Sequence, residues 1–494
     1  MAAKRPLFTN LISKQEIFAV AVCLLGLLCG FDRPSRAVEL PSQKLSPAEL
    51  AGDFHIFREA LEQGHPGIYR YTTKPEMDQL FHDAELSLSR GMDAVSFYRE
   101  LVPIVAAVKC GHTGLSLPSS LTRNFSLLPL RIRVLDGRIY VKRDLATADA
   151  HLEGKEISFI NGLAANKIVS GLLAGAFGDG DVKSSRQWDV SGSNFNASII
   201  ALLGLQSPYR IVLQGTAAPL DLQGIDHDQL MQTWKARYPK DLDLQPSPDP
   251  SLKFLDGESI AIMKIASFGH SEADAKRIDL RGFFKRSFTE ISEKKTKALI
   301  LDLRNNGGGE DEIGKILFSY FAVGPFKWYD DIVLNGINFD FLRYVSDPDP
   351  IPADIVQRQA DGKYHAIGHP NWGVQQPLEP HFTGKAYVLM NGRSFSTTSE
   401  LLSQMRSHHA ATLIGEESAG AYYGNNSGFE PTITLPASRI TLRVPLAAYY
   451  LAVQHEGSNS SGVLPDYPVK YSIQDELMGS DKDTAVALRL IRGH

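Results

Sequence analysis

The segment Asn391-Gly-Arg-Ser-Phe-Ser-Thr-Thr-Ser-Glu400 gathers hydroxyl side chains between an apolar strand pattern, residues 385–390, and a helix pattern that continues to Met405. On a tight strand-to-helix turn, Ser396 would expose its hydroxyl and Thr397 would keep a free backbone N–H. Acyl transfer needs that combination, a nucleophile beside a donor for the oxyanion. The alternative is that the hydroxyls only cap the helix, since Ser and Thr are favoured at N-caps and Thr397 has capping-box spacing to Glu400.

His112, between Gly111 and Thr113, is the candidate general base, because a free hydroxyl is a weak nucleophile without one. The alternative is a structural or exposed histidine, since the chain has 14 of them. The pair His408-His409 is most simply a solvated helix end. The sequence holds no H-E-x-x-H pair, so we expect neither a metal nor a cofactor.

A glycine-rich turn, Asp302-Leu-Arg-Asn-Asn-Gly-Gly-Gly309, follows a buried-strand pattern and precedes a helix pattern. Glycines let the backbone approach a ligand closely, and free N–H groups at a helix start favour an anion. The turn lacks the Lys-Ser/Thr of a phosphate loop and the spacing of a dinucleotide fingerprint, which disfavours a nucleotide. The alternative is a simple strand-to-helix connection.

The surrounding patterns predict how these residues are positioned. Residues 46–107 have helical spacing, with Ser46-Pro-Ala-Glu49 as a helix start. Residues 126–215 are β-rich, with a hairpin at Asp136-Gly137. Residues 216–250 are rich in Pro, Asp and Gln and indicate a connector. From residue 252 strands alternate with helices, which is typical of an α/β layer with parallel strands. The aromatic and Pro-rich residues 325–380 indicate an insertion, for which a lid or an oligomer contact are both open roles.

Charge, the N-terminal residues and the cysteine count exclude some classes of function and indicate where the protein acts. The 494 residues carry a net charge of −5 without a long basic run, which argues against a nucleic-acid surface. Basic residues, an apolar stretch from 17 to 31 and Ser35-Arg-Ala37 predict a secretory signal peptide over residues 1–37. The alternative is an uncleaved anchor, although the stretch is shorter than the roughly 20 residues that span a bilayer. After cleavage Cys110 alone remains, which predicts no internal disulfide. No later segment is long and apolar enough to span a membrane, so we expect no stable membrane insertion after cleavage.

Together these motifs resemble the tail-specific, or C-terminal processing, serine peptidase family. The resemblance runs from about Leu50 to Lys470 and is carried by Val108-Lys-Cys-Gly-His-Thr113, Ile157-Ser-Phe-Ile-Asn-Gly162, Leu299-Ile-Leu-Asp-Leu-Arg-Asn-Asn-Gly-Gly308, Ser394-Phe-Ser-Thr-Thr-Ser-Glu400, Thr412-Leu-Ile-Gly-Glu416 and Gly462-Val-Leu-Pro-Asp-Tyr467. It implies an α/β fold with a helical N-terminal region (38–125), a PDZ-like β-rich module (126–222), a linker (223–251), a crotonase-like (ββα) catalytic domain (252–475) and a C-terminal tail (476–494).

The resemblance also implies roles for individual residues. Ser396 would be the nucleophile, with the oxyanion held by the N–H of Thr397 and of Gly308, or of Gly307 or Gly309 instead. Ala421 stands where one branch of the family has a catalytic lysine, so the chain is more similar to the tricorn-like branch, with His112 as base. Glu456 lies about where that branch has its third member, although it could equally belong to a solvated turn. The remaining expectations are that Asp302 and Arg304 hold the glycine-rich turn, and that Cys110 is a small buried residue.

Two hypotheses follow. The first is an exported, periplasmic or extracellular serine peptidase that cleaves a peptide or unfolded protein through an acyl-enzyme, with substrate C-termini added as an edge strand to the PDZ-like module. The second is a catalytically inactive peptide- or ligand-binding protein on the same fold, because fold does not fix function. A third and less favoured hypothesis is a crotonase-like enzyme that acts on an acyl thioester.

Overall fold

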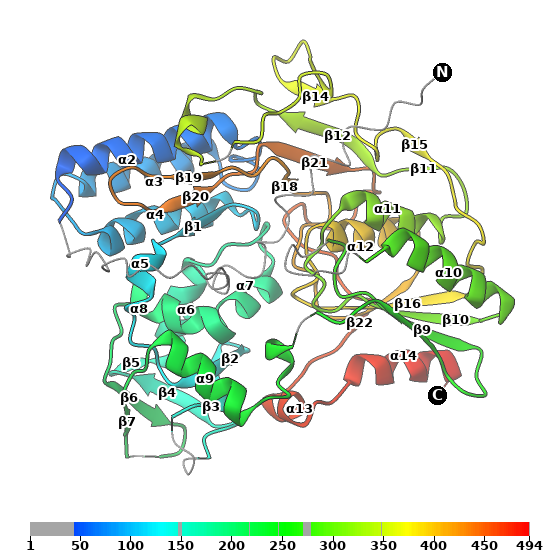
Figure 1. Ribbon diagram of the computed structural model, residues 1–494, viewed down its shortest axis with the longest axis horizontal. Coiled ribbons are helices and arrows are strands. Elements are labelled where there is room, and N and C mark those ends of the chain that lie inside the picture. Colours follow the sequence, from blue (N-terminus) through cyan, green and yellow to red (C-terminus); the bar gives the residue numbers. More distant parts are fainter. Residues whose placement is uncertain are drawn as a thin grey trace, which may run out of the picture.

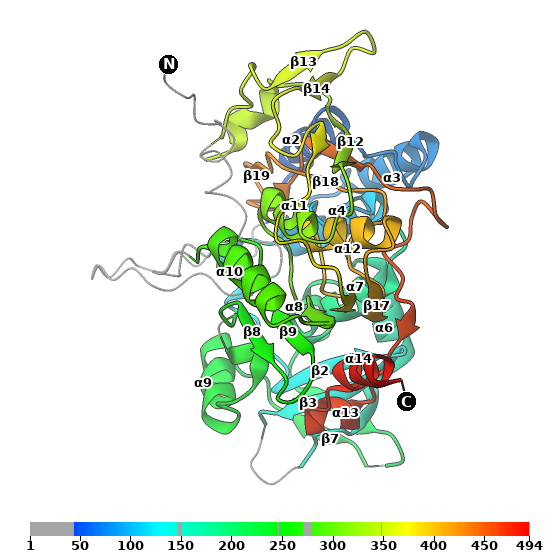
Figure 2. The same ribbon diagram turned by 90° about the vertical axis from the view of Figure 1, so that its right-hand side faces the viewer.

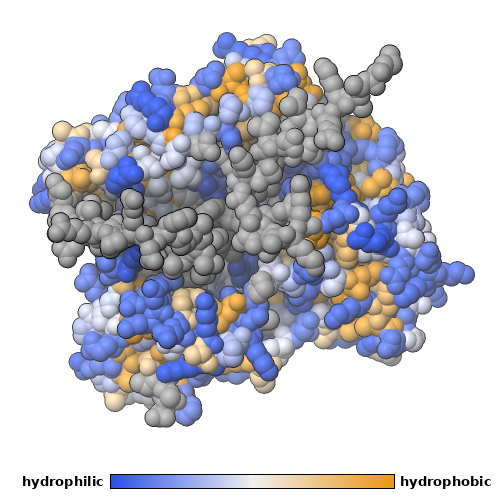
Figure 3. All heavy atoms as spheres, in the orientation of Figure 1, coloured by the Kyte–Doolittle hydropathy of each residue, from blue (hydrophilic) through white to orange (hydrophobic). Residues whose placement is uncertain are grey.

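The computed structural model describes residues 44–146, 151–216, 218–245, 247–269, 278–346 and 348–493 (Figure 1). The predicted signal peptide, residues 1–37, lies outside them. Within the described ranges, none of the helices combines the length and the apolar character needed to cross a bilayer. Hydrophilic residues predominate on the face shown in Figure 3, and hydrophobic residues form scattered patches.

Three helices form the N-terminal region, as the sequence predicted: α2 (Pro47–Glu59), α3 (Lys74–Ser87) and α4 (Ala94–Val108). Ser46 and Thr73 begin α2 and α3 with capping boxes, and the Asp93 side chain caps α4. α4 ends at Lys109, whose φ of 54° breaks the helix. The chain then turns through residues 110–113 into β1 (Gly114–Ser116), which pairs with β20 (Thr441–Arg443).

The β-rich module is a sheet in the order β2 (Leu130–Leu135), β3 (Arg138–Asp144), β4 (Glu156–Ile160), β6 (Tyr209–Leu213) and β7 (Leu220–Leu222), with β5 (Leu163–Ala164) against β4. The helices α6 (Ala165–Ala174), α7 (Lys183–Asp189) and α8 (Gly192–Ala201) pack around it. The expected linker over 223–251 is partly structured. It contains α9 (His227–Arg237), whose Leu230 and Trp234 are buried in the core of the module.

The outer edge of β2 is covered by the chain's own segment 191–196. Ile132 forms a bridge with Gly192, Val134 donates its N–H to Ser191 Oγ at 3.0 Å, and the Leu130 carbonyl accepts from Asn196 at 3.3 Å. An incoming peptide can extend a sheet only where the edge strand still has unpaired N–H and C=O groups. Because these three alternate residues are engaged, β2 does not offer a free edge for a substrate C-terminus.

The large α/β layer contains the sheet β22 (Tyr467–Pro468), β17 (Thr412–Gly415), β16 (Lys385–Met390), β10 (Ala298–Asp302), β9 (Ile260–Lys264) and β8 (Ser251–Phe254). Neighbouring strands from β22 to β9 are parallel, and β8 is antiparallel. One face carries α10 (Leu280–Glu293), α11 (Asp311–Ser319) and α12 (Thr397–Ser407) (Figure 1). These elements agree with the predicted alternation.

The C-terminal residues cover the other face of this sheet. α14 (Lys482–Arg492) packs on β10, β16 and β17, where Ala487 joins a core with Ile300 and Leu389. α13 (Ile473–Met478) lies against the module, and Glu476 pairs with Arg133 at 2.7 Å (Figure 2). The expected tail over 476–494 is therefore a structural element, because the sheet needs a second apolar cover that the sequence pattern did not reveal.

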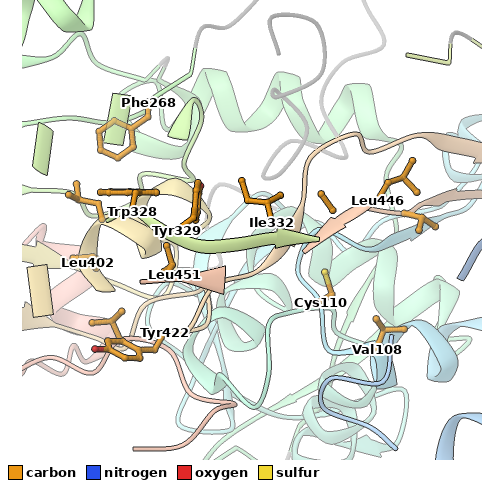
Figure 4. Close-up of a cluster of buried hydrophobic side chains, with 14 of the residues drawn as sticks. Val108, Cys110, Phe268, Trp328, Tyr329, Ile332, Leu402, Tyr422, Leu446 and Leu451 are labelled. Atoms are coloured by element: carbon orange, nitrogen blue, oxygen red, sulfur yellow. The ribbon is translucent and has the colours of Figure 1, made fainter. Parts of the chain in front are cut away.

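The insertion 325–380 supplies strands to a second sheet. Its order is β13 (Val356–Arg358), β14 (Tyr364–Ala366), β12 (Tyr329–Leu334), β21 (Ala447–Leu451) and β18 (Asn426–Ser427), and β11 (Phe326–Lys327) pairs separately with β15 (Val374–Gln375). Figure 4 shows Trp328, Tyr329 and Ile332 in one hydrophobic cluster with Leu402, Leu451, Val108 and Cys110. One core therefore joins the N-terminal helices to the helix that follows Ser396.

Candidate active site

Ser396 occupies the turn between β16 and α12 with an unusual backbone conformation, φ 54° and ψ −128°. Non-glycine residues rarely adopt such angles, and they persist where the surrounding structure imposes them. Ser396 makes no side-chain cap to α12, so its hydroxyl is available for chemistry. The neighbouring hydroxyls are used for support: Ser394 Oγ donates to Leu303 O, Thr397 Oγ1 to Gly309 O and Ser399 Oγ to Ser394 O.

His112, which follows α4 in the N-terminal region, contacts this hydroxyl. Its Nε2 lies 3.1 Å from Ser396 Oγ, and its ring stacks on Phe395 with 4.5 Å between centroids. The side chain is buried, and burial lowers the pKa of His112 to about 3, with the nearby charge of Arg443 acting in the same direction. A neutral imidazole at hydrogen-bond distance from a serine hydroxyl has the geometry of a general base.

A second buried histidine, His65, supports the turn that carries His112. Its Nδ1 accepts the N–H of Gly67 at 3.1 Å, so Nε2 carries the proton and donates to Thr113 Oγ1 at 3.0 Å. Burial lowers the pKa of His65 to about 3, which keeps it neutral. No sequence motif marked this residue, because the contact joins positions 48 residues apart.

The glycine-rich turn lies directly against the nucleophile. Gly308 has φ 105°, and a Cβ at this position would come within 2.7 Å of Ser396 Cβ and 3.1 Å of Thr397 N. Its own N–H, however, donates to Asn306 Oδ1 at 2.9 Å. The expectation of a free Gly308 donor is therefore not met in this conformation. Among the described residues, the N–H groups of Thr397, Gly307 and Gly309 have no acceptor.

Arg304 and Asp302 brace the same turn. The guanidinium binds Asp302 through two hydrogen bonds of 2.9 and 2.8 Å, and it also contacts Asp481 at 2.7 Å and Asp483 at 3.0 Å. Asp481 caps α14 and Asp483 lies in its first turn. The pair therefore holds the glycine-rich turn, as predicted, and also attaches the C-terminal helix to it.

Glu456 is not placed beside His112. Its carboxylate binds Arg406 at 3.0 Å, its side chain is 37% exposed, and Arg406 also binds Asp466 at 2.7 Å. Position along the chain suggested the role, but the arginine on α12 directs the carboxylate to the surface. Nδ1 of His112 is buried and has no hydrogen-bond partner among the described residues.

Cys110 is fully enclosed and donates its thiol to Asn426 O at 3.5 Å. Burial raises the pKa of Cys110 to about 12, so it remains a thiol and is a poor nucleophile. The Cys110 sulfur, a ring nitrogen of His112 and a carboxylate oxygen of Asp179 lie within 4.8 Å of one another. Zinc would accept these donor types, but it binds the thiolate, which this environment disfavours.

A comparison with models of protein families finds a match in the large α/β layer. Residues 259–469, which include β9 to β22 and Ser396, match the model of peptidase family S41. This match supports a serine-type peptidase, which is a hydrolase, in the part of the chain that contains Ser396. No curated protein sequence matches the chain significantly.

Solved structures extend the likeness beyond residues 259–469. The structure of mature CPAF complexed with lactacystin matches with a TM-score of 0.61 at 15% identity, over 90% of this chain and 100% of that one. The crystal structure of the CPAF S499A mutant matches with a TM-score of 0.61 at 14% identity, over 89% and 96%. At such low identity the likeness concerns the fold, which includes the N-terminal helices and the module.

Proposed function

We propose that Ser396 and His112 hydrolyse peptide bonds through an acyl-enzyme. The observation that carries this proposal is the 3.1 Å contact between His112 Nε2 and Ser396 Oγ, made on the strained turn at the start of α12. His112 would accept the hydroxyl proton as Ser396 attacks the carbonyl carbon, and would return it to the leaving amine. Water, deprotonated by the same imidazole, would then release the acyl group.

The N–H of Thr397 supplies one oxyanion donor in this proposal, because it lies at the first residue of α12, where the helix dipole also favours negative charge. The glycine-rich turn supplies the second. The N–H groups of Gly307 and Gly309 have no acceptor among the described residues. The N–H of Gly308 would first have to break its hydrogen bond to Asn306 Oδ1. The Ser/His assignment is supported further by Ala421, a buried residue without an amine, at the position where the resemblance places the lysine of the other branch.

Substrate enters this site as an extended or unfolded peptide in our proposal. PDZ-like recruitment of substrate C-termini remains part of the proposal, and it would use an edge other than β2, because residues 191–196 occupy the β2 edge. Export to the periplasm or the outside of the cell remains part of the proposal on the strength of the signal-peptide pattern over residues 1–37. N-terminal sequencing of the secreted chain tests that part.

The test of the activity is cleavage of a library of unstructured peptides, followed by mass spectrometry, beside a fluorophosphonate probe that labels activated serines. The wild-type chain should cleave peptides and take up the probe, while Ser396→Ala and His112→Ala should do neither. Thermal melting of each variant checks that the fold is retained. Cleavage that survives in a folded Ser396→Ala variant would reject the proposed nucleophile.

A further inference from the structure

The loop formed by residues 178–182 of the module contacts both the segment before His112 and the chain that follows Ser396. Gly180 donates its N–H to Lys109 O at 2.9 Å, and Asp181 donates its N–H to Ser460 O at 2.6 Å. The Asp181 carboxylate also pairs with Lys109 at 2.6 Å. The loop thus joins the turn that carries His112 to the segments that follow Ser396.

Asp179 is the buried residue of this loop, with 2% of its surface exposed. Its Oδ1 accepts the N–H of Gly111 at 2.7 Å, and its Oδ2 accepts the N–H of Ala421 at 3.3 Å. Backbone N–H groups that donate to a carboxylate favour its ionised form. Burial raises the pKa of Asp179 and these two N–H groups oppose that rise, so a buried carboxylate is held against the residue immediately before His112.

The tautomer that His112 needs as a base indicates a role for the Asp179 carboxylate. When Nε2 accepts the proton of Ser396, the neutral ring must carry its own proton on Nδ1. Nδ1 is the ring nitrogen nearer to the main chain, and Asp179 binds the main chain at Gly111. A ring nitrogen of His112 and a carboxylate oxygen of Asp179 lie within 4.8 Å of each other, a separation that one bridging water spans.

We propose that Asp179 is the positioning residue that holds His112 in the Nδ1–H tautomer and stabilises the imidazolium formed as Ser396 attacks. This inference rests on the proposed function of Ser396 and His112. Glu456, which the resemblance suggested for the role, binds Arg406 instead, and the nearby Cys110 thiol donates to Asn426 O. Charged and titratable groups also surround the pair, namely Arg443 and His65 around His112, and Arg70, Arg186, Tyr71 and Cys110 around Asp179.

The kinetic test compares Asp179→Asn and Asp179→Glu with Asp181→Asn, a control in the same loop whose side chain is largely exposed. We expect Asp179→Asn to lower kcat by about 10²- to 10⁴-fold with KM changed only a few-fold, because a wrong tautomer affects the transition state. Asp179→Glu should recover part of the loss, and Asp181→Asn should keep wild-type kinetics. A folded Asp179→Asn variant with kcat within threefold of wild type would overturn the proposal.

A spectroscopic test reads the tautomer of His112 directly, without an activity measurement. Full-length Ser396→Ala protein labelled with ¹⁵N-histidine should show the Nδ1–H tautomer for His112, assigned by comparison with a chain that also carries His112→Gln. Addition of Asp179→Asn should move the population toward Nε2–H. If His112 is Nε2–H while Asp179 is present, the proposal is wrong whatever the kinetics.

The outcomes separate this inference from the proposed function. If Ser396→Ala and His112→Ala abolish cleavage while Asp179→Asn does not, the dyad stands and the role of Asp179 fails. If Glu456→Gln abolishes cleavage and Asp179→Asn leaves it intact, the carboxylate has been misassigned. If Ser396→Ala still cleaves peptides at the wild-type rate, the proposed function itself fails.

Discussion

Gly111→Ala tests whether the close packing of Gly111 against Phe395, the residue before Ser396, is needed for activity. A Cβ on Gly111 would lie 2.7 and 2.8 Å from two ring carbons of Phe395, which stacks on the His112 imidazole. Gly111 does not have a positive φ, so alanine meets no backbone strain there. Carbon atoms pack best at about 3.5–4.0 Å, so the Phe395 ring must move by roughly 0.8 Å.

We expect this displacement to lower kcat about 100-fold, since a 1 Å misplacement of reacting groups can cost that much. Such a loss corresponds to about 2.7 kcal/mol of activation free energy. Overpacking should also destabilise the fold by about 1–3 kcal/mol. The assay is steady-state peptide cleavage at a temperature where thermal melting shows all variants folded. Gly52→Ala is the matched control, because a Cβ there contacts nothing within 4 Å.

A double-mutant cycle isolates the clash. Phe395→Leu removes the two ring carbons, so Gly111→Ala should cost much less activity in that background than in the wild type. Equal losses in both backgrounds would show that the effect does not pass through Phe395. A Gly111→Ala variant within threefold of the wild-type rate would refute the reasoning about the close fit.

Three further predictions concern pH and the supporting network. Because burial lowers the pKa of His112 to about 3, kcat/KM should stay level from pH 8 to pH 5, and an acid limb near pH 6.5 would contradict a buried base. Burial and the charge of Asp311 raise the pKa of Glu400 to about 7 from an ordinary 4.5. Its protonated form is therefore favoured in the fold, so urea unfolding should show stability falling as pH rises from 4.5 to 7, and Glu400→Gln should fall less. Arg304→Ala leaves Asp302 and Asp483 without their cation, which should lower the free energy of unfolding by about 3 kcal/mol, measured by urea titration.

The sequence predicted Ser396 as nucleophile and His112 as base because the neighbours of these two residues impose local requirements. A strand, a turn and a helix place Ser396, and the helix end before Cys110 places His112. The same local logic identified Asp302 and Arg304, whose contact spans two residues. Helices and strands of the catalytic layer follow from apolar periodicity, which is also a local property.

What could not be predicted depends on contacts across the chain. Asp179 lies in a Gly- and Asp-rich stretch without a motif, and only folding brings it to Gly111, 68 residues away. Glu456 had the expected sequence position, but Arg406 fixes its carboxylate at the surface. The covered β2 edge and the role of α14 likewise depend on which segment docks on which face.

The separation of 284 positions between His112 and Ser396 has a consequence for the chain before it is folded. In the proposed site, the base comes from the N-terminal region, the loop beside it from the module, and the nucleophile from the last quarter of the chain. A growing or truncated polypeptide that ends before residue 396 holds no part of the site that can act alone. With this site, peptidase activity would arise only after residue 396 has joined the fold, so an unfinished chain would not cleave other proteins.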